Sequence, residues 1–177
     1  MIKEILNEGY CKIDYQIDIP IKEFDNSEWN SFHDTYWKLE MCDWTPGKSP
    51  MGPAATKWCM DMYNLNMDIL EDDLYGNTNN FKSSLLKYHK GYIGEHTDRG
   101  TLSFVYNEYP GLYIRVNNEW KELDNGLFIW LGDMGAKQFN KPAMEHKVKC
   151  ENIRWSLNYF SAPTDIDYPW TIPENNE

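Results

Sequence analysis

The chain has 177 residues, 41% of them hydrophobic and 15% aromatic, and its formal net charge is −11. This length fits one domain with its own core, and the composition excludes a disordered polymer. A protein that binds a phosphate backbone is expected to be basic, so nucleic acid is not an expected partner. The acidity is uneven, because residues 1–80 hold 6 basic and 15 acidic side chains whereas residues 81–177 hold 11 and 13.

The N-terminal residues do not resemble a secretion signal. Charged side chains are spread through Met1–Tyr15, which therefore lacks the apolar core of a signal peptide. The longest apolar run, Leu127–Leu131, is too short to cross a membrane. The four cysteines, at positions 11, 42, 59 and 150, form no C-x-x-C pair. We therefore expect a cytoplasmic protein in a reducing compartment, without membrane association.

The first 80 residues predict a strand, a helix and two breaks. Glu8–Tyr15 is typical of a strand, and the Pro- and Gly-rich segment Thr45–Pro53 predicts a loop. Apolar residues at helical spacing predict a helix over Asn66–Leu74, and Gly76–Asn80 is a second break. We expect these residues to form a short helical region packed on the rest of the chain.

Aromatic residues in this region admit two interpretations. Trp44, Trp58 and Tyr63 either form a lid over a substrate or pack the region onto the remaining domain. We favour the packing interpretation. His33 is interpreted as a surface residue.

After Phe81 the sequence becomes a series of strand-length segments separated by turn signals, which predicts a mainly β sandwich, jelly roll or barrel. We expect a single domain, with an N-terminal region over 1–80, a β core over 81–163 and a tail over 164–177. The predicted strands are Ser84–His89, Thr101–Tyr106, Gly111–Val116, Trp120–Leu123, Leu127–Leu131, Met144–Val148 and Ile153–Phe160.

Metal-ligand chemistry concentrates in the second half. His96 and Asp98 are two positions apart, so in extended backbone their side chains point to the same side. This pair alone is a weak signal, because a His and an Asp often share a surface turn. His146 adds a second imidazole, which completes the two-His, one-carboxylate set of non-haem Fe(II) oxygenases. Eight residues on, Arg154 and Ser156 offer a guanidinium and a hydroxyl suited to a carboxylate.

With these motifs in order, residues 85–163 resemble the 2-oxoglutarate/Fe(II)-dependent dioxygenases, specifically the isopenicillin N synthase-like branch. The segments most similar to the family are His96–Phe104, Pro110–Ile114, Glu119–Leu123, Gly126–Met134, Glu145–Val148 and Arg154–Phe160. The resemblance implies a double-stranded β-helix, a jelly-roll and cupin-like barrel. This expectation agrees with the series of short strands.

The resemblance also implies a set of site residues. His96, Asp98 and His146 would bind Fe(II), while Arg154 and Ser156 would hold the distal carboxylate of 2-oxoglutarate. Tyr88 is a candidate for an aromatic hydroxyl that reaches this cosubstrate. The implied reaction uses O2 to hydroxylate a C–H bond of a small-molecule substrate, with release of succinate and CO2.

Two alternatives stay open at this point. One is an iron oxidase that does not use 2-oxoglutarate and carries out ring closure or desaturation, and the other is a non-catalytic barrel that binds metal or a small ligand. For the substrate we expect a neutral or cationic molecule if the acidic segment faces the mouth of the site.

Neighbouring residues receive structural interpretations. Asp133 is placed in a structural turn, His89 at the cavity rim, and the segment from His89 to His96 in a short loop. Asn158 and Phe160 share the strand parity of Arg154 and Ser156, so we expect them to line the cavity. The residues interpreted as core or barrel wall are Phe104, Trp130, Leu157 and Tyr159.

Overall fold

The computed structural model describes residues 1–17, 30–31, 36–40, 53–70, 80–88 and 91–162. The interpretations given above for His33, Trp44, His89 and residues 45–52, 76–79 and 164–177 concern residues outside these ranges. No helix within the described ranges is long and apolar enough to span a membrane.

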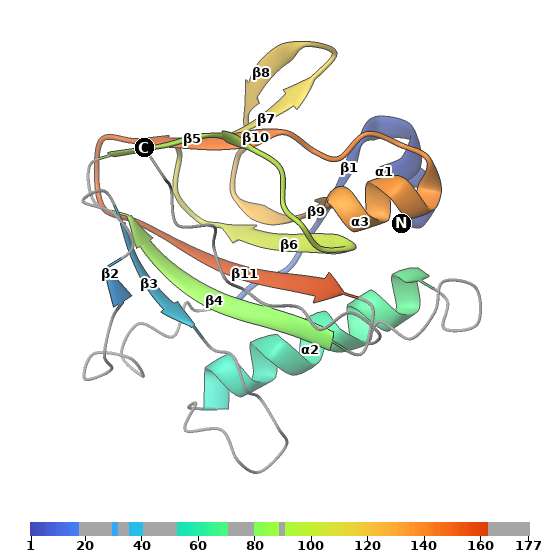
Figure 1. Ribbon diagram of the computed structural model, residues 1–177. Coiled ribbons are helices and arrows are strands. Elements are labelled where there is room, and N and C mark those ends of the chain that lie inside the picture. The colour runs from blue at the N-terminus through green and yellow to red at the C-terminus, as the bar shows by residue number, and fades with distance from the viewer. Residues whose placement is uncertain (18–29, 32–35, 41–52, 71–79, 89–90, 163–177) are drawn as a thin grey trace.

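Two antiparallel sheets lie face to face (Figure 1). The major sheet has the spatial order β1 (Tyr10–Ile13), β9 (Gly126–Leu131), β6 (Leu102–Asn107), β11 (Arg154–Ala162), β4 (Asn80–Tyr88), β3 (Tyr36–Glu40) and β2 (Asn30–Ser31). The minor sheet has the order β5 (Gly91–His96), β10 (His146–Cys150), β7 (Leu112–Val116) and β8 (Glu119–Glu122). This arrangement confirms the predicted mainly β, jelly-roll architecture.

The space between the sheets holds one of two apolar clusters. It combines residues of the major sheet, such as Phe128 and Trp130, with Ile114 and Val148 of the minor sheet. The β7–β8 connection is a two-residue turn in which Asn117 and Asn118 both have positive φ, at 51° and 65°. Asparagine tolerates this conformation, which matches the twist of the flanking strands, so the hairpin forms where the sequence predicted a turn.

The second cluster lies on the other face of the major sheet. The helix α2 (Pro53–Leu70) covers this face below β4 and β11 (Figure 1). Trp58 of α2 is fully buried there, and its indole N–H donates a hydrogen bond of 3.0 Å to Ser83 Oγ. Because α2 packs on the sheet face that points away from the barrel interior, Trp58 packs the N-terminal region onto the barrel and does not cover the site.

Several element boundaries differ from the sequence predictions. Residues 91–96 form the edge strand β5 and not a short loop, because their backbone pairs with β10. Two glycines interrupt the side-chain alternation, so the sequence did not predict this strand. The helix α2 begins at Pro53 in the predicted loop, since proline is favourable in the first turn of a helix. Of the helix predicted over Asn66–Leu74, residues 66–70 form the end of α2, and residues 71–74 lie outside the described ranges.

Two short helices were not predicted. The first, α1 (Ile2–Glu8), ends at Gly9, whose φ of 86° lets its N–H reach Ile5 O, so the following strand begins at Tyr10. The second, α3 (Asp133–Phe139), begins at the residue that was assigned to a structural turn.

Candidate metal centre

The two candidate histidine ligands face each other across neighbouring strands. His96 is the last residue of β5 and His146 the first of β10, and the strand register pairs them directly. Their ring centroids are 4.2 Å apart. The ladder between β5 and β10 therefore positions both imidazoles at the same end of the minor sheet.

Asp98 lies in the loop that follows β5. Backbone hydrogen bonds hold this loop: Asp133 N–H donates to Asp98 O at 2.7 Å, and Met134 N–H donates to Gly100 O at 3.1 Å. A Cβ on Gly132 would lie 2.3 Å from Gly100 O and 2.8 Å from Asp98 O. Only glycine fits there, because the start of α3 approaches the loop so closely.

The three ligand groups converge. One ligand atom from each of His96, Asp98 and His146 lies within 4.8 Å of the others, and His146 Nε2 is 3.7 Å from Asp98 Oδ1. His96 Nδ1 is 2.8 Å from Gly94 O, and His146 Nδ1 is 3.2 Å from Met144 O. Because a carbonyl oxygen only accepts, each Nδ1 carries a proton and donates, so in a neutral ring Nε2 is the nitrogen available to bind a metal.

The surroundings favour a neutral imidazole and a fixed carboxylate. Burial lowers the pKa of His146, against the opposing effect of the nearby Asp98 carboxylate. The indole N–H of Trp130 donates a 3.2 Å hydrogen bond to Asp98 Oδ2, and the Trp130 ring centroid lies 5.0 Å from that of His146. Trp130 was interpreted as core or barrel wall, so sequence reasoning missed its contact with the candidate ligand.

Arg154 is a buried cation at the start of β11. Its side chain is 1% exposed, and its Nη2 donates to Asn107 Oδ1 at 2.6 Å. The guanidinium carbon lies 4.9 Å from the centroid of the Tyr88 ring. Among the described residues, Arg154 Nε and Nη1 have no hydrogen-bond partner, and no carboxylate forms an ion pair with Arg154. Buried donors of this kind are costly unless a ligand accepts from them.

The remaining predicted residues line the same face of the major sheet. Ser156 is buried, with its hydroxyl 3.4 Å from Tyr106 O and from Asn158 Oδ1. Tyr88 lies opposite Arg154 in the β4–β11 register. Burial raises the pKa of Tyr88 to about 12, although the Arg154 guanidinium acts to lower it, so the phenol keeps its proton at neutral pH.

Sequence reasoning also missed Asn107. This residue is fully buried at the end of β6 and accepts the hydrogen bond from Arg154. Its only sequence signal is a polar residue at the end of an otherwise apolar strand, which is equally typical of a turn. Asn158 is buried and Phe160 is half-buried, and both lie on the strand at the parity of Arg154.

Neither a scan against protein-family models nor a search of curated proteins finds a match to the sequence. Solved structures do match it. A candidate oxygenase from Shewanella oneidensis has a TM-score of 0.71 and 17% identity, with 92% of this chain and 84% of that chain covered. A prolyl-4-hydroxylase from Pseudomonas putida has a TM-score of 0.69 and 14% identity, with coverages of 92% and 96%.

A third structure is a full-length protein from Neurospora crassa, in complex with alpha-KG and 5-formyluracil. Its TM-score is 0.62 at 16% identity, with 97% of this chain and 80% of that chain covered. At these identities the likeness establishes a common fold. It confirms the predicted double-stranded β-helix and, at the level of fold, the resemblance to the 2-oxoglutarate/Fe(II) oxygenases.

Proposed function

We propose that this protein is an Fe(II)- and 2-oxoglutarate-dependent oxygenase that hydroxylates a C–H bond of a small-molecule substrate. The proposal depends chiefly on one observation: a two-His, one-Asp ligand set shares the barrel interior with a buried guanidinium that has unpartnered donors. The likeness to structures of oxygenases and hydroxylases supports this proposal.

The donor set fits ferrous iron. Two imidazoles and one carboxylate are the ligand set of non-haem Fe(II) oxygenases, and such a set would leave coordination positions open for further ligands. His96 and His146 would bind through Nε2, because their Nδ1 atoms are engaged with backbone carbonyls. Trp130 would hold the non-ligating oxygen of Asp98 and so fix the carboxylate orientation.

Arg154 fits a dicarboxylate cosubstrate. A carboxylate placed beside its unpartnered Nε and Nη1 would balance the buried charge and satisfy the donors. The Ser156 hydroxyl and the protonated phenol of Tyr88 flank this position on the same face. When bound, the iron and 2-oxoglutarate supply oxidation by O2 with release of succinate and CO2, and the protein orients them and excludes water.

The first experiment measures cosubstrate binding to the full chain under anaerobic conditions. Fe(II) and 2-oxoglutarate together should give the weak visible absorption band of an iron chelate. Arg154→Ala should lose this band while it keeps its affinity for Fe(II), whereas His96→Ala and Asp98→Ala should lose metal binding in calorimetry. Arg115→Ala is the matched control, because Arg115 is an exposed residue of β7 whose side chain pairs with Glu145.

The outcomes separate three functions. Fe(II) binding without the absorption band contradicts a 2-oxoglutarate enzyme and favours an oxidase or a non-catalytic barrel. Unchanged Fe(II) affinity in both His96→Ala and Asp98→Ala contradicts the proposed metal site.

We also propose a neutral or cationic substrate, because the net charge of −11 repels polyanions at long range. Succinate release should be screened over small neutral, cationic and polyanionic compounds. Prolyl peptides belong in the screen, since one of the matching structures is a prolyl-4-hydroxylase. Full activity on a nucleic acid would contradict the charge preference without affecting the proposed reaction.

A further inference from the structure

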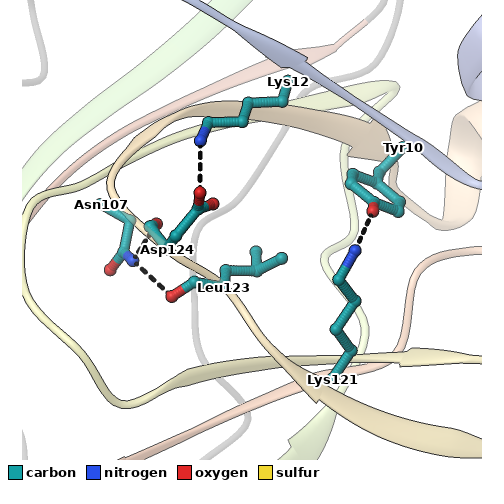
Figure 2. A network of polar contacts seen from close by, with 6 residues as sticks. All are labelled: Tyr10, Lys12, Asn107, Lys121, Leu123 and Asp124. Atoms are coloured by element: carbon teal, nitrogen blue, oxygen red, sulfur yellow. Dashed lines mark hydrogen bonds and ion pairs between the residues drawn. The ribbon is translucent and has the colours of Figure 1, made fainter.

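Asn107 connects the buried cation of the site to a turn of the barrel. It ends β6, is fully buried, and lies opposite Ser156 in the β6–β11 register. Its Oδ1 accepts from Arg154 Nη2 at 2.6 Å. On the other side, its Nδ2 donates to Leu123 O at 3.3 Å and to Asp124 O at 2.8 Å (Figure 2).

These three contacts fix the orientation of the Asn107 amide. A guanidinium has donors only, so the amide oxygen must face Arg154. Backbone carbonyls only accept, so the amide nitrogen must face the turn at Leu123 and Asp124. An aspartate would lack the donor that the turn requires. An alanine would make neither contact.

The turn is itself tied to β1. Lys12 Nζ forms an ion pair of 2.6 Å with Asp124 Oδ2, and Lys121 Nζ donates to Tyr10 Oη at 2.7 Å on the same side of the barrel (Figure 2). Asn107 therefore connects the Arg154 guanidinium to the segment 121–124, which contacts β1 at Tyr10 and Lys12.

The neutrality of Asn107 matters as much as its position. Within the described part of the chain, no carboxylate pairs with Arg154; its Nη2 donates to this uncharged amide, and the neutral Tyr88 phenol also lies beside the guanidinium. An amide oxygen orients the guanidinium without neutralising it. The full positive charge is then left for an anionic ligand, since two nearby carboxylates would otherwise compete for it.

We propose that Asn107 is a positioning residue for the distal carboxylate of the cosubstrate: it fixes the Arg154 guanidinium through an uncharged acceptor and keeps its charge available. This inference rests on the proposed function, because it assigns to Asn107 a role toward the carboxylate that Arg154 would bind. Asn107 itself does not contact the metal ligands in this assignment.

The test compares two 2-oxo acids on the Fe(II)-loaded protein under anaerobic conditions. 2-Oxoglutarate has a distal carboxylate, whereas 2-oxobutyrate offers iron the same chelating group without one. Asn107→Asp should weaken 2-oxoglutarate binding about 100-fold, because the new carboxylate neutralises Arg154 and repels the ligand. Asn107→Ala should weaken it about tenfold through lost orientation. Both variants should bind 2-oxobutyrate and Fe(II) as the wild type does.

Controls separate this role from a structural one. Asn125→Ala changes an exposed asparagine of the same turn and should leave both affinities unchanged. Circular dichroism and thermal unfolding show which variants are folded. If Asn107→Ala does not fold, Asn107→Ser replaces it, and its hydroxyl should preserve more 2-oxoglutarate affinity than Asn107→Asp does.

Each result decides between the two proposals. Wild-type protein that binds Fe(II) but not 2-oxoglutarate overturns the proposed function and this inference with it. Wild-type binding of 2-oxoglutarate together with unchanged affinity in Asn107→Asp overturns the inference alone. An equal loss of affinity for both 2-oxo acids also overturns it, because general damage to the metal centre would then explain the effect.

Discussion

The two faces of the major sheet are both buried, but they differ in what they bury. On β11, Leu157 and Tyr159 point to the face covered by α2 and belong to the same apolar cluster as Trp58. The alternate residues Arg154 and Ser156 point into the barrel. Because successive side chains of a strand point to opposite faces, β11 places its apolar packing residues on one face and the polar groups of the candidate site on the other.

The difference has an energetic meaning. The helix-covered face buries apolar side chains, each of which is more stable away from water. The barrel face buries a cation with unpartnered donors, which lowers stability unless a ligand accepts from them. Burial alone does not distinguish the faces, since Arg154 and Leu157 are 1% and 0% exposed. Substitutions on the helix-covered face should therefore lower the free energy of unfolding, whereas substitutions on the barrel face should mainly weaken ligand binding.

The largest effect is expected on the helix-covered face. Trp58→Ala should lower the free energy of unfolding by about 4 kcal/mol, because it removes a fully buried indole and its hydrogen bond to Ser83. Urea unfolding measures this loss. Met60→Ala on the same helix, at a side chain 46% exposed, should change stability by less than about 0.5 kcal/mol. Equal losses in both variants would contradict a packing role for this face of α2.

Arg154→Met tests the barrel face, where we expect a substitution to reduce ligand binding and not stability. It should weaken 2-oxoglutarate binding about 100-fold, because the charge partner of the distal carboxylate is lost. The free energy of unfolding should stay within about 1 kcal/mol of wild type, since removal of an unbalanced buried charge offsets the hydrogen bond lost at Asn107. A destabilisation as large as that of Trp58→Ala would mean that the two faces do not divide stability from binding.

Trp130→Phe tests whether the hydrogen bond from Trp130, a residue of the barrel face, helps the candidate ligand Asp98 to bind metal. It keeps an aromatic ring but removes the N–H that donates to Asp98 Oδ2. Fe(II) affinity, measured by anaerobic calorimetry, should fall about tenfold. Trp155→Phe is the matched control, because Trp155 lies on the same sheet and packs against the helix-side cluster. Unchanged affinity in Trp130→Phe would assign the indole to packing alone.

The same contrast explains what the sequence could predict. The turn-separated strand segments predicted the mainly β fold, and the family resemblance selected His96, Asp98 and His146 as candidate ligands. Each motif is local in sequence, and the structure brings the three groups within 4.8 Å of one another. The local geometry was less predictable. Asp98 reaches the histidines through a loop held by the start of α3, and no sequence period encodes such a contact.

Residues whose role depends on a distant partner were missed for a physical reason. Trp130 is a large aromatic residue of the kind usually found in a core. Only the hydrogen bond from its indole N–H to Asp98 shows that it also contacts a candidate ligand. In the sequence, Asn107 is only a polar residue at the end of a strand. Its contact with the site becomes visible in the hydrogen bond that it accepts from Arg154. The strand β5 was hidden because Gly91 and Gly94 interrupt the expected alternation, although β10 pairs with it. In each case the deciding interaction joins elements far apart in the chain.

The smallest effect concerns a thiol on the helix-covered face. Burial raises the pKa of Cys59 to about 11 from an ordinary value of 9.0. Between these values the unfolded chain loses the thiol proton while the folded chain keeps it. Stability is therefore fully present below pH 9 and falls as the pH rises toward 11, by about 1 kcal/mol at pH 10.

Urea unfolding at pH 8, 9 and 10 measures this contribution when wild type is compared with Cys59→Ala, because the other groups that titrate at alkaline pH are present in both chains. The wild-type free energy of unfolding should fall more steeply with pH than that of the variant. Parallel curves would show that the thiol is not held in an apolar environment. The helix-covered face would then admit water, and the contrast with the polar barrel face would be weaker than the packing of Trp58 and Leu157 indicates.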